Sequence, residues 1–117
     1  MNTAARIAIA IVALLHAYFM ILEMFLWTKP FGRRTFGLTR ELAEASKSLA
    51  MNQGLYNGFL AAGLIWGLAA NSFDVKVFFL VCVIVAGVFG AFTAKRTILF
   101  VQALPGALAL AAVVAAR

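Results

Sequence analysis

The sequence has few charged residues, one cysteine and one histidine, and each scarcity removes a class of site. Only 12% of its 117 residues are charged, and four acidic side chains stand against ten basic ones. The single cysteine, Cys82, allows no disulfide within the chain, and neither it nor the histidine belongs to a metal-ligand spacing. No P-loop, glycine-rich dinucleotide turn or Ser-His-Asp set is present. We therefore expect no metal site, and the sequence leaves the cofactor unknown.

Apolar residues are abundant instead. They make up 65% of the chain, and the mean hydropathy is +1.01. A soluble domain is about 45–50% apolar and roughly 25% charged. At roughly 20 apolar residues per membrane span, this chain accommodates four spans. We predict an all-α fold, namely a polytopic integral membrane protein with a four-transmembrane-helix bundle, in which residues 1–117 form a single transmembrane domain.

Four apolar runs define the predicted spans, at about residues 7–27, 49–70, 73–93 and 97–116. Residues 28–48 form a basic loop with proline and glycine turn formers in its first part. Its second part is an amphipathic pre-helix that begins after an N-cap at Thr39. We expect the pre-helix to continue into the second span as one helix, residues 40–70. Pro105 should kink the last span.

Lysine and arginine are unevenly distributed between the predicted loops. Residues 28–48 and 94–97 carry seven of them, and the rest of the chain carries three. The positive-inside rule then places these two loops in the cytoplasm and both termini outside the inner cell membrane. Basic loops beside apolar runs suit anionic lipid headgroups, so we expect a lipid-bilayer partner and no nucleic acid. The candidate headgroup or anion contacts are Arg33, Arg34, Lys47, Lys95 and Arg96.

Nearly all polar residues within the spans fall in their cytoplasmic halves. His16 and Glu23 are seven residues apart, so they lie on nearly one face of the first span, and they are the candidate acid-base groups. Together these polar residues would line a chamber that binds a lipophilic or anionic small molecule. The expected ligand-binding residues are Asn52, Gln53, Tyr56, Asn57, Thr93 and Gln102.

Each of these groups also has a structural explanation. Glu23 can reach the interface and pair with Lys29 or Arg33, and the amides can hold helices together. Three functions therefore stay open: binding or catalysis on a lipophilic molecule, a small transport subunit, and a structural or assembly protein. Whether the protein is an enzyme is left open.

The second span also carries two G-x-x-x-G pairs, Gly54/Gly58 and Gly63/Gly67. Small residues at this spacing let another helix approach closely, either within the protomer or between copies. Because four short helices barely enclose a cavity, we expect a homo-oligomer.

Several stretches together resemble one known family. They read N-Q-G-L-Y-N-G-F-L-A-A-G-L at 52–64, H-A-Y-F-M-I-L-E-M-F-L-W at 16–27, A-G-V-F-G-A-F-T at 86–93 and Q-A-L-P at 102–105. The chain is similar over nearly its whole length to the small bacterial membrane proteins of the domain of unknown function 1304 family. The resemblance implies a compact four-span inner-membrane protein, and it implies no activity.

Overall fold

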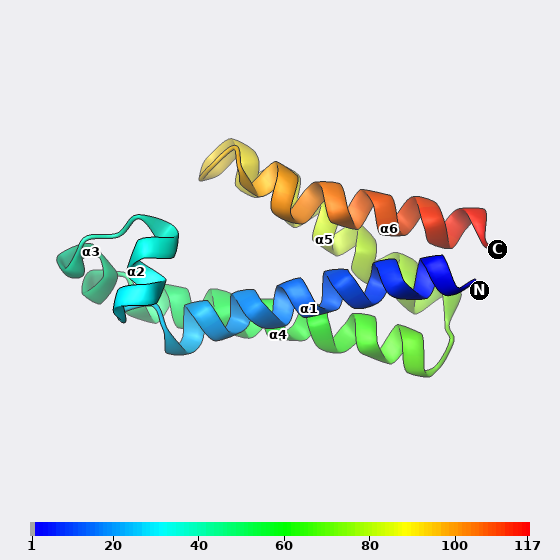
Figure 1. Cartoon of the computed structure of the whole chain (residues 1–117), viewed down its shortest axis with the longest axis horizontal. Coiled ribbons are helices and arrows are strands. Elements are labelled where there is room, and N and C mark those ends of the chain that lie inside the picture. The colour runs from blue at the N-terminus through cyan, green and yellow to red at the C-terminus, as the bar shows by residue number, and fades with distance from the viewer. Residues whose placement is uncertain (1) are drawn as a thin grey trace. The chain divides into compact units, whose positions relative to one another are not determined.

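The computed structural model describes residues 2–117, and all the regular secondary structure in this range is helical, which confirms the all-α prediction (Figure 1). Two of these helices, the first and the fifth, are each long and apolar enough to cross a membrane. The elements are α1 (Thr3–Phe25), α2 (Pro30–Phe36), α3 (Arg40–Ala45), α4 (Lys47–Ala69), α5 (Phe73–Thr93), the π-helical η1 (Leu99–Ala103) and α6 (Leu104–Ala115).

The residues pack as two compact units, and the boundary between them falls inside α1 and α4. The α5–α6 unit contains the chain up to Leu14 together with Leu60–Arg117. The α2–α3 unit contains Leu15–Phe59.

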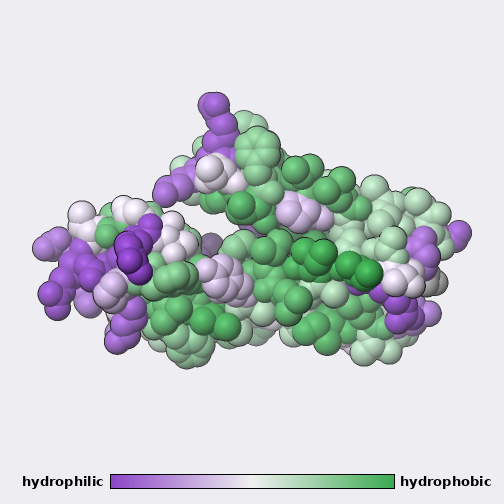
Figure 2. All heavy atoms as spheres, in the orientation of Figure 1, coloured by the Kyte–Doolittle hydropathy of each residue, from purple (hydrophilic) through white to green (hydrophobic). Residues whose placement is uncertain are grey.

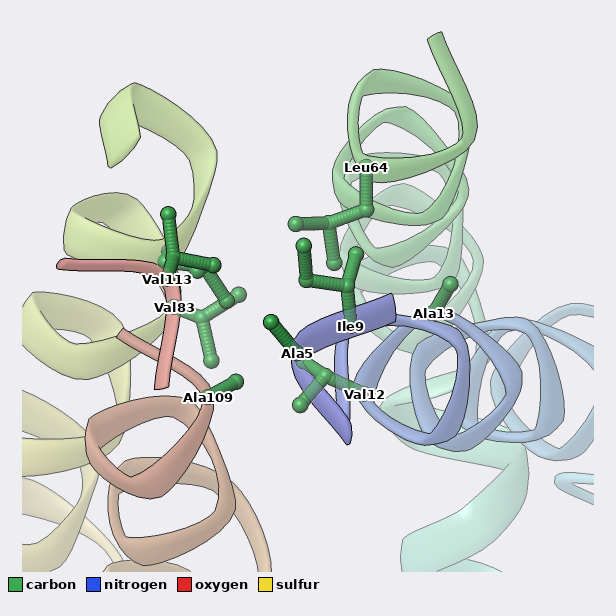
Figure 3. Packing of buried hydrophobic residues seen from close by; sticks show 9 residues of the cluster. Ala5, Ile9, Val12, Ala13, Leu64, Val83, Ala109 and Val113 are labelled. Atoms are coloured by element: carbon green, nitrogen blue, oxygen red, sulfur yellow. The ribbon is translucent and has the colours of Figure 1, made fainter. Parts of the chain in front are cut away.

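The core of the α5–α6 unit is built from small and branched apolar side chains that recur every three or four residues (Figure 3). This spacing places them on one face of each helix, so each helix contributes one stripe. The buried members are Ala5, Ile9, Val12 and Ala13 of α1, Leu64 of α4, Leu80 and Val83 of α5, and Ala109 and Val113 of α6.

The last predicted span is interrupted by a π-helical turn, η1, which ends two residues before Pro105. Proline has no backbone N–H, so the Val101 carbonyl has no partner at the ordinary α-helical position. In a π turn each carbonyl pairs one residue further along, as in the bond from the Leu104 N–H to the Leu99 carbonyl. The turn thus accommodates the interruption that the sequence predicts at Pro105.

In the α2–α3 unit, the first part of the predicted basic loop 28–48 is not a series of turns, because seven of its residues form α2. Proline and glycine act here as helix ends. Pro30 occupies the first turn of α2, and Gly37 ends it in the left-handed conformation at φ 66°. The predicted N-cap is confirmed, since the Thr39 hydroxyl accepts a hydrogen bond from the Leu42 N–H at 3.1 Å.

The prediction of one continuous helix over residues 40–70 also needs correction. Helix α3 ends at Ala45, and Ser46 has φ −102° and ψ 7°, outside the α-helical range. The Ser46 hydroxyl accepts a hydrogen bond at 3.0 Å from the indole N–H of Trp27. This tertiary contact is absent from a local reading of the sequence.

Helix α1 presents an apolar stripe on its exposed side as well as on its buried side. A surface helix of a soluble protein carries polar residues there. Helix α5 behaves in the same way, and its Phe92 is 87% exposed. The exposed stripe of α1 consists of Ile7, Ile11, Leu14, Tyr18, Ile21 and Phe25. By contrast, hydrophilic residues gather over α2 and α3 within the α2–α3 unit (Figure 2).

Two glycines of α5 offer a matched test of the packing between α5 and η1. A Cβ atom on Gly87 would lie 2.5 Å from the backbone nitrogen of Ala103, whereas one on Gly90 would meet only side-chain atoms of Ile98, at 3.2 Å and beyond. We expect Gly87→Ala to lower the free energy of unfolding by about 1–3 kcal/mol, because the backbones must separate. Gly90→Ala should leave it unchanged or raise it, since alanine favours the helix.

The stability of both variants is measured by thermal unfolding in mild detergent. A thiol-reactive dye, which labels the half-buried Cys82 as it becomes exposed, reports the unfolding. Equal stability of Gly87→Ala and Gly90→Ala would contradict the close contact.

Candidate functional site

The structure brings together two of the sequence-predicted site residues, Glu23 of α1 and Asn57 of α4. Both lie in the α2–α3 unit, and both are half-buried. The Asn57 side-chain amide, through Nδ2, donates a hydrogen bond to Oε1 of Glu23. A carboxyl group among apolar side chains needs such a partner, because leaving it without a hydrogen bond costs free energy. The hydrogen bond therefore holds the Glu23 carboxyl group in place between two largely apolar helix faces.

The missing side chains of Gly54 and Gly58 make this contact possible. A Cβ atom on Gly54 would lie 3.1 Å from both the Met20 carbonyl oxygen and the Glu23 Cβ. A Cβ atom on Gly58 would lie 2.8 Å from the Met20 sulfur. The first G-x-x-x-G pair thus serves packing within the chain. The flexible, polarizable thioether of Met20 packs against the Gly58 position.

The second glycine pair also packs within the chain, in the α5–α6 unit. Gly63 faces the ring of Phe79, and a Cβ atom on Gly67 would lie 3.2 Å from the backbone nitrogen of Lys76. Both pairs are therefore used inside one protomer. They give no support to the predicted homo-oligomer, which stays a prediction.

His16, the other candidate acid-base group, is completely buried. It continues the stripe that includes Ile9 and Val12, and its ring meets Phe19 edge to face with centroids 5.4 Å apart. Seven residues of α-helix rise about 10 Å, so His16 and Glu23 do not form a directly hydrogen-bonded pair. A molecule that contacts both groups would have to extend along two turns of α1.

The remaining predicted ligand-binding residues are placed differently. Asn52, Gln53 and Tyr56 are exposed on α4, and the Tyr56 ring packs against Phe59 with centroids 6.0 Å apart. The Thr93 hydroxyl donates to the Phe89 carbonyl at 2.8 Å, so its own helix satisfies it. Gln102 is half-buried in η1. Asn57 is the member of this set that hydrogen-bonds to Glu23.

The predicted headgroup contacts fall at three places. Arg33 and Arg34 are in α2, and Lys47 is exposed at the first residue of α4. Lys95 and Arg96 are exposed in the turn between α5 and η1. Each of these places lies beyond an end of a long helix or in its first turn, which suits contact with lipid headgroups.

The sequence reasoning missed a polar pair in the α5–α6 unit, Lys76 and Asn71. It counted Lys76 only as one of the three basic residues outside the cytoplasmic loops, but the residue is only 2% exposed, and its ammonium donates to Oδ1 of Asn71 at 2.7 Å. Asn71 follows the end of α4 at φ 47°, the left-handed position of a Schellman turn. The spacing of Lys76, Leu80, Val83 and Gly87 was a usable signal, because it puts Lys76 on the buried stripe of α5.

Within residues 2–117, no three histidine, cysteine, aspartate or glutamate side chains are grouped so that they could hold a metal ion. Glu23 instead offers a carboxyl group that is held by the amide of Asn57. Such a group can accept hydrogen bonds, balance a cation or exchange a proton with a bound molecule.

Comparison with known proteins gives one family and one relative. The family described as Protein of unknown function (DUF1304) matches residues 10–114. The chain is similar to the Uncharacterized protein YpaA of Lactococcus lactis subsp. lactis (strain IL1403), with 32% identity over 108 residues. That match covers 89% of this chain and 88% of the relative. No solved structure matches the chain. The chain therefore belongs to the DUF1304 family of proteins of unknown function.

Proposed function

We propose that this protein is a four-span protein of the inner membrane that binds a lipophilic small molecule at the Glu23–Asn57 pair. The observation that carries the proposal is the hydrogen bond from Asn57 to the Glu23 carboxyl group between apolar helices. An ionisable group within a membrane-spanning segment is costly, and its presence is by default a sign of function.

Membrane insertion is supported by the exposed apolar stripes of α1 and α5. Helix α4 has 23 residues and is therefore about 35 Å long, which is enough to cross a hydrocarbon core of about 30 Å. Its three amides lower its hydropathy, and Asn57 is the one that Glu23 contacts. The apolar stretch Leu99–Ala115 would supply the fourth span.

The ligand should combine an apolar body with a polar head. The apolar body suits the surroundings of the pair, where Met20 and Met24 meet the glycine face of α4. The polar head would hydrogen-bond to the Glu23 carboxyl group, since Asn57 occupies only part of its acceptor capacity. His16 lies two turns closer to the start of α1 and is completely buried, so the proposed contact is with Glu23 and not with His16.

An alternative is supported by the same contact, because a carboxyl–amide hydrogen bond also holds two helices together. In that case the protein would be structural, and the pair would have no ligand. The two functions differ in what they require of residue 23. A ligand site needs an ionisable carboxyl group, whereas helix association needs only a hydrogen-bond acceptor.

Glu23→Gln separates the two functions, because glutamine keeps an acceptor for Asn57 and loses the ionisable group. We expect the variant to keep its thermal stability and to lose a copurified small molecule. The affinity should fall roughly 10- to 100-fold, as a hydrogen bond to a charged group contributes about 1.5–3 kcal/mol. Native mass spectrometry of protein extracted in mild detergent measures the adduct.

Glu44→Gln is the matched control, since Glu44 is exposed on α3 and should keep the adduct. Glu23→Leu removes the acceptor altogether and should destabilise the protein under either function. An adduct that survives Glu23→Gln unchanged, or a wild-type protein that carries only mixed bulk lipid, would reject the ligand site and favour the structural role.

The proposed topology makes a separate prediction. With four spans and seven of ten basic residues in loops 28–48 and 94–97, both termini should face away from the cytoplasm. Alkaline phosphatase fused after Arg117 should be active, and green fluorescent protein fused there should be dark. Fusions after Gly37 should give the opposite pattern. A fluorescent fusion after Arg117 would show that the number of spans or the orientation is wrong.

A further inference from the structure

A pocket of ≈ 330 Å³ lies in the α2–α3 unit, outside the Glu23–Asn57 site. Its lining contains two arginines, two apolar side chains, one glycine and no acidic residue. Pockets for small ligands begin at about this size, and a phosphate ester is small enough to enter. The lining residues are Pro30, Arg33, Arg34, Gly37 and Leu38.

The backbone around the two arginines is fixed by the turn that ends α2. The Gly37 N–H donates to the Arg34 carbonyl at 3.4 Å, and the Leu38 N–H donates to the Arg33 carbonyl at 2.8 Å. This is a Schellman turn, which requires the left-handed conformation that Gly37 adopts. A Cβ atom on Gly37 would meet nothing within 4 Å, so this side of the turn is open.

Helix α2 is itself held against its neighbours in the unit. The ring of Phe36 packs on Trp27 with centroids 4.8 Å apart, and the Trp27 indole donates to Ser46. Gly32 is buried against the backbone of Leu26 and Trp27, where no side chain would fit. The arginines therefore project from an anchored helix and not from a free loop.

Arg33 lines the pocket, and its Nε atom is fully buried and makes no hydrogen bond with residues 2–117. A buried donor without an acceptor costs about 1–3 kcal/mol, so native proteins usually supply a partner. The guanidinium group has a fixed fork of donors that matches two oxygens of a phosphate group.

We propose that this pocket binds a phosphate group through the guanidinium groups of Arg33 and Arg34. The phosphate belongs either to an anionic lipid headgroup or to a soluble phosphorylated molecule. The headgroup source fits the position of α2, which begins five residues after the end of α1, a helix long enough to cross a membrane. The proposal does not depend on the ligand of the Glu23–Asn57 pair.

The test is isothermal titration of the full-length protein in an uncharged detergent, with sodium phosphate and with dihexanoyl phosphatidylglycerol as separate probes. We expect saturable one-site binding of at least one probe. Arg33→Lys keeps the charge and loses the guanidinium fork, so it should weaken binding about tenfold or more. Arg34→Gln should weaken it as well. Arg40→Gln removes the same charge from an exposed position at the start of α3 and is the matched control.

Binding of the lipid alone would support the pocket and assign it to a headgroup. Binding of both probes, or of phosphate alone, would support it for a soluble phosphorylated molecule. Saturable binding that Arg33→Lys leaves unchanged, or that Arg40→Gln weakens as much as Arg33→Lys, would overturn the proposal in favour of diffuse charge attraction. Absence of saturable binding with both probes would overturn it outright.

Discussion

The approach of α4 to α1 depends on two interface positions of α4 that carry no side chain. At Gly54 the Met20 carbonyl oxygen and the Glu23 Cβ occupy the space that a side chain would need. Any larger residue would push the helices apart, and the amide of Asn57 would no longer reach the Glu23 carboxyl group. The polar contact in the α2–α3 unit is thus a consequence of backbone packing.

Helical periodicity predicts which polar residues of α4 can take part in this contact. The buried or half-buried residues Ala50, Gly54, Asn57, Ala61 and Leu64 are separated alternately by four and three positions, which defines one face. The three amides and the tyrosine differ in register. Asn57 lies on the buried face, Asn52 and Tyr56 lie off it, and Gln53 lies at its edge; these last three residues are exposed. The sequence could therefore separate Asn52 and Tyr56 from Asn57 by register, but the predicted chamber grouped all four residues by depth alone.

The fold was predictable where a feature is local, and less so where it depends on contacts distant in the sequence. The all-helical class, the Thr39 N-cap and the interruption near Pro105 all follow from local chemistry. The residues of α2 were misread because proline and glycine mark helix ends as well as turns. The break at Ser46 coincides with a hydrogen bond from Trp27, nineteen residues away, which no local pattern contains.

The Glu23–Asn57 and Lys76–Asn71 pairs differ in how far apart the two partners lie in the sequence and in how exposed the charged residue is. Both differences bear on function. Asn71 contacts Lys76 from five residues away, at a turn whose geometry the backbone already fixes. Glu23 receives its hydrogen bond from a residue 34 positions away. A carboxylate has about four acceptor sites, and Asn57 fills one, so acceptor capacity is left for a bound molecule. Lys76 is 2% exposed, which closes it to a ligand, whereas Glu23 is only half-buried. The pair with the spare acceptor is therefore the stronger candidate for binding, and the lysine–asparagine pair is better explained as support for the turn between α4 and α5.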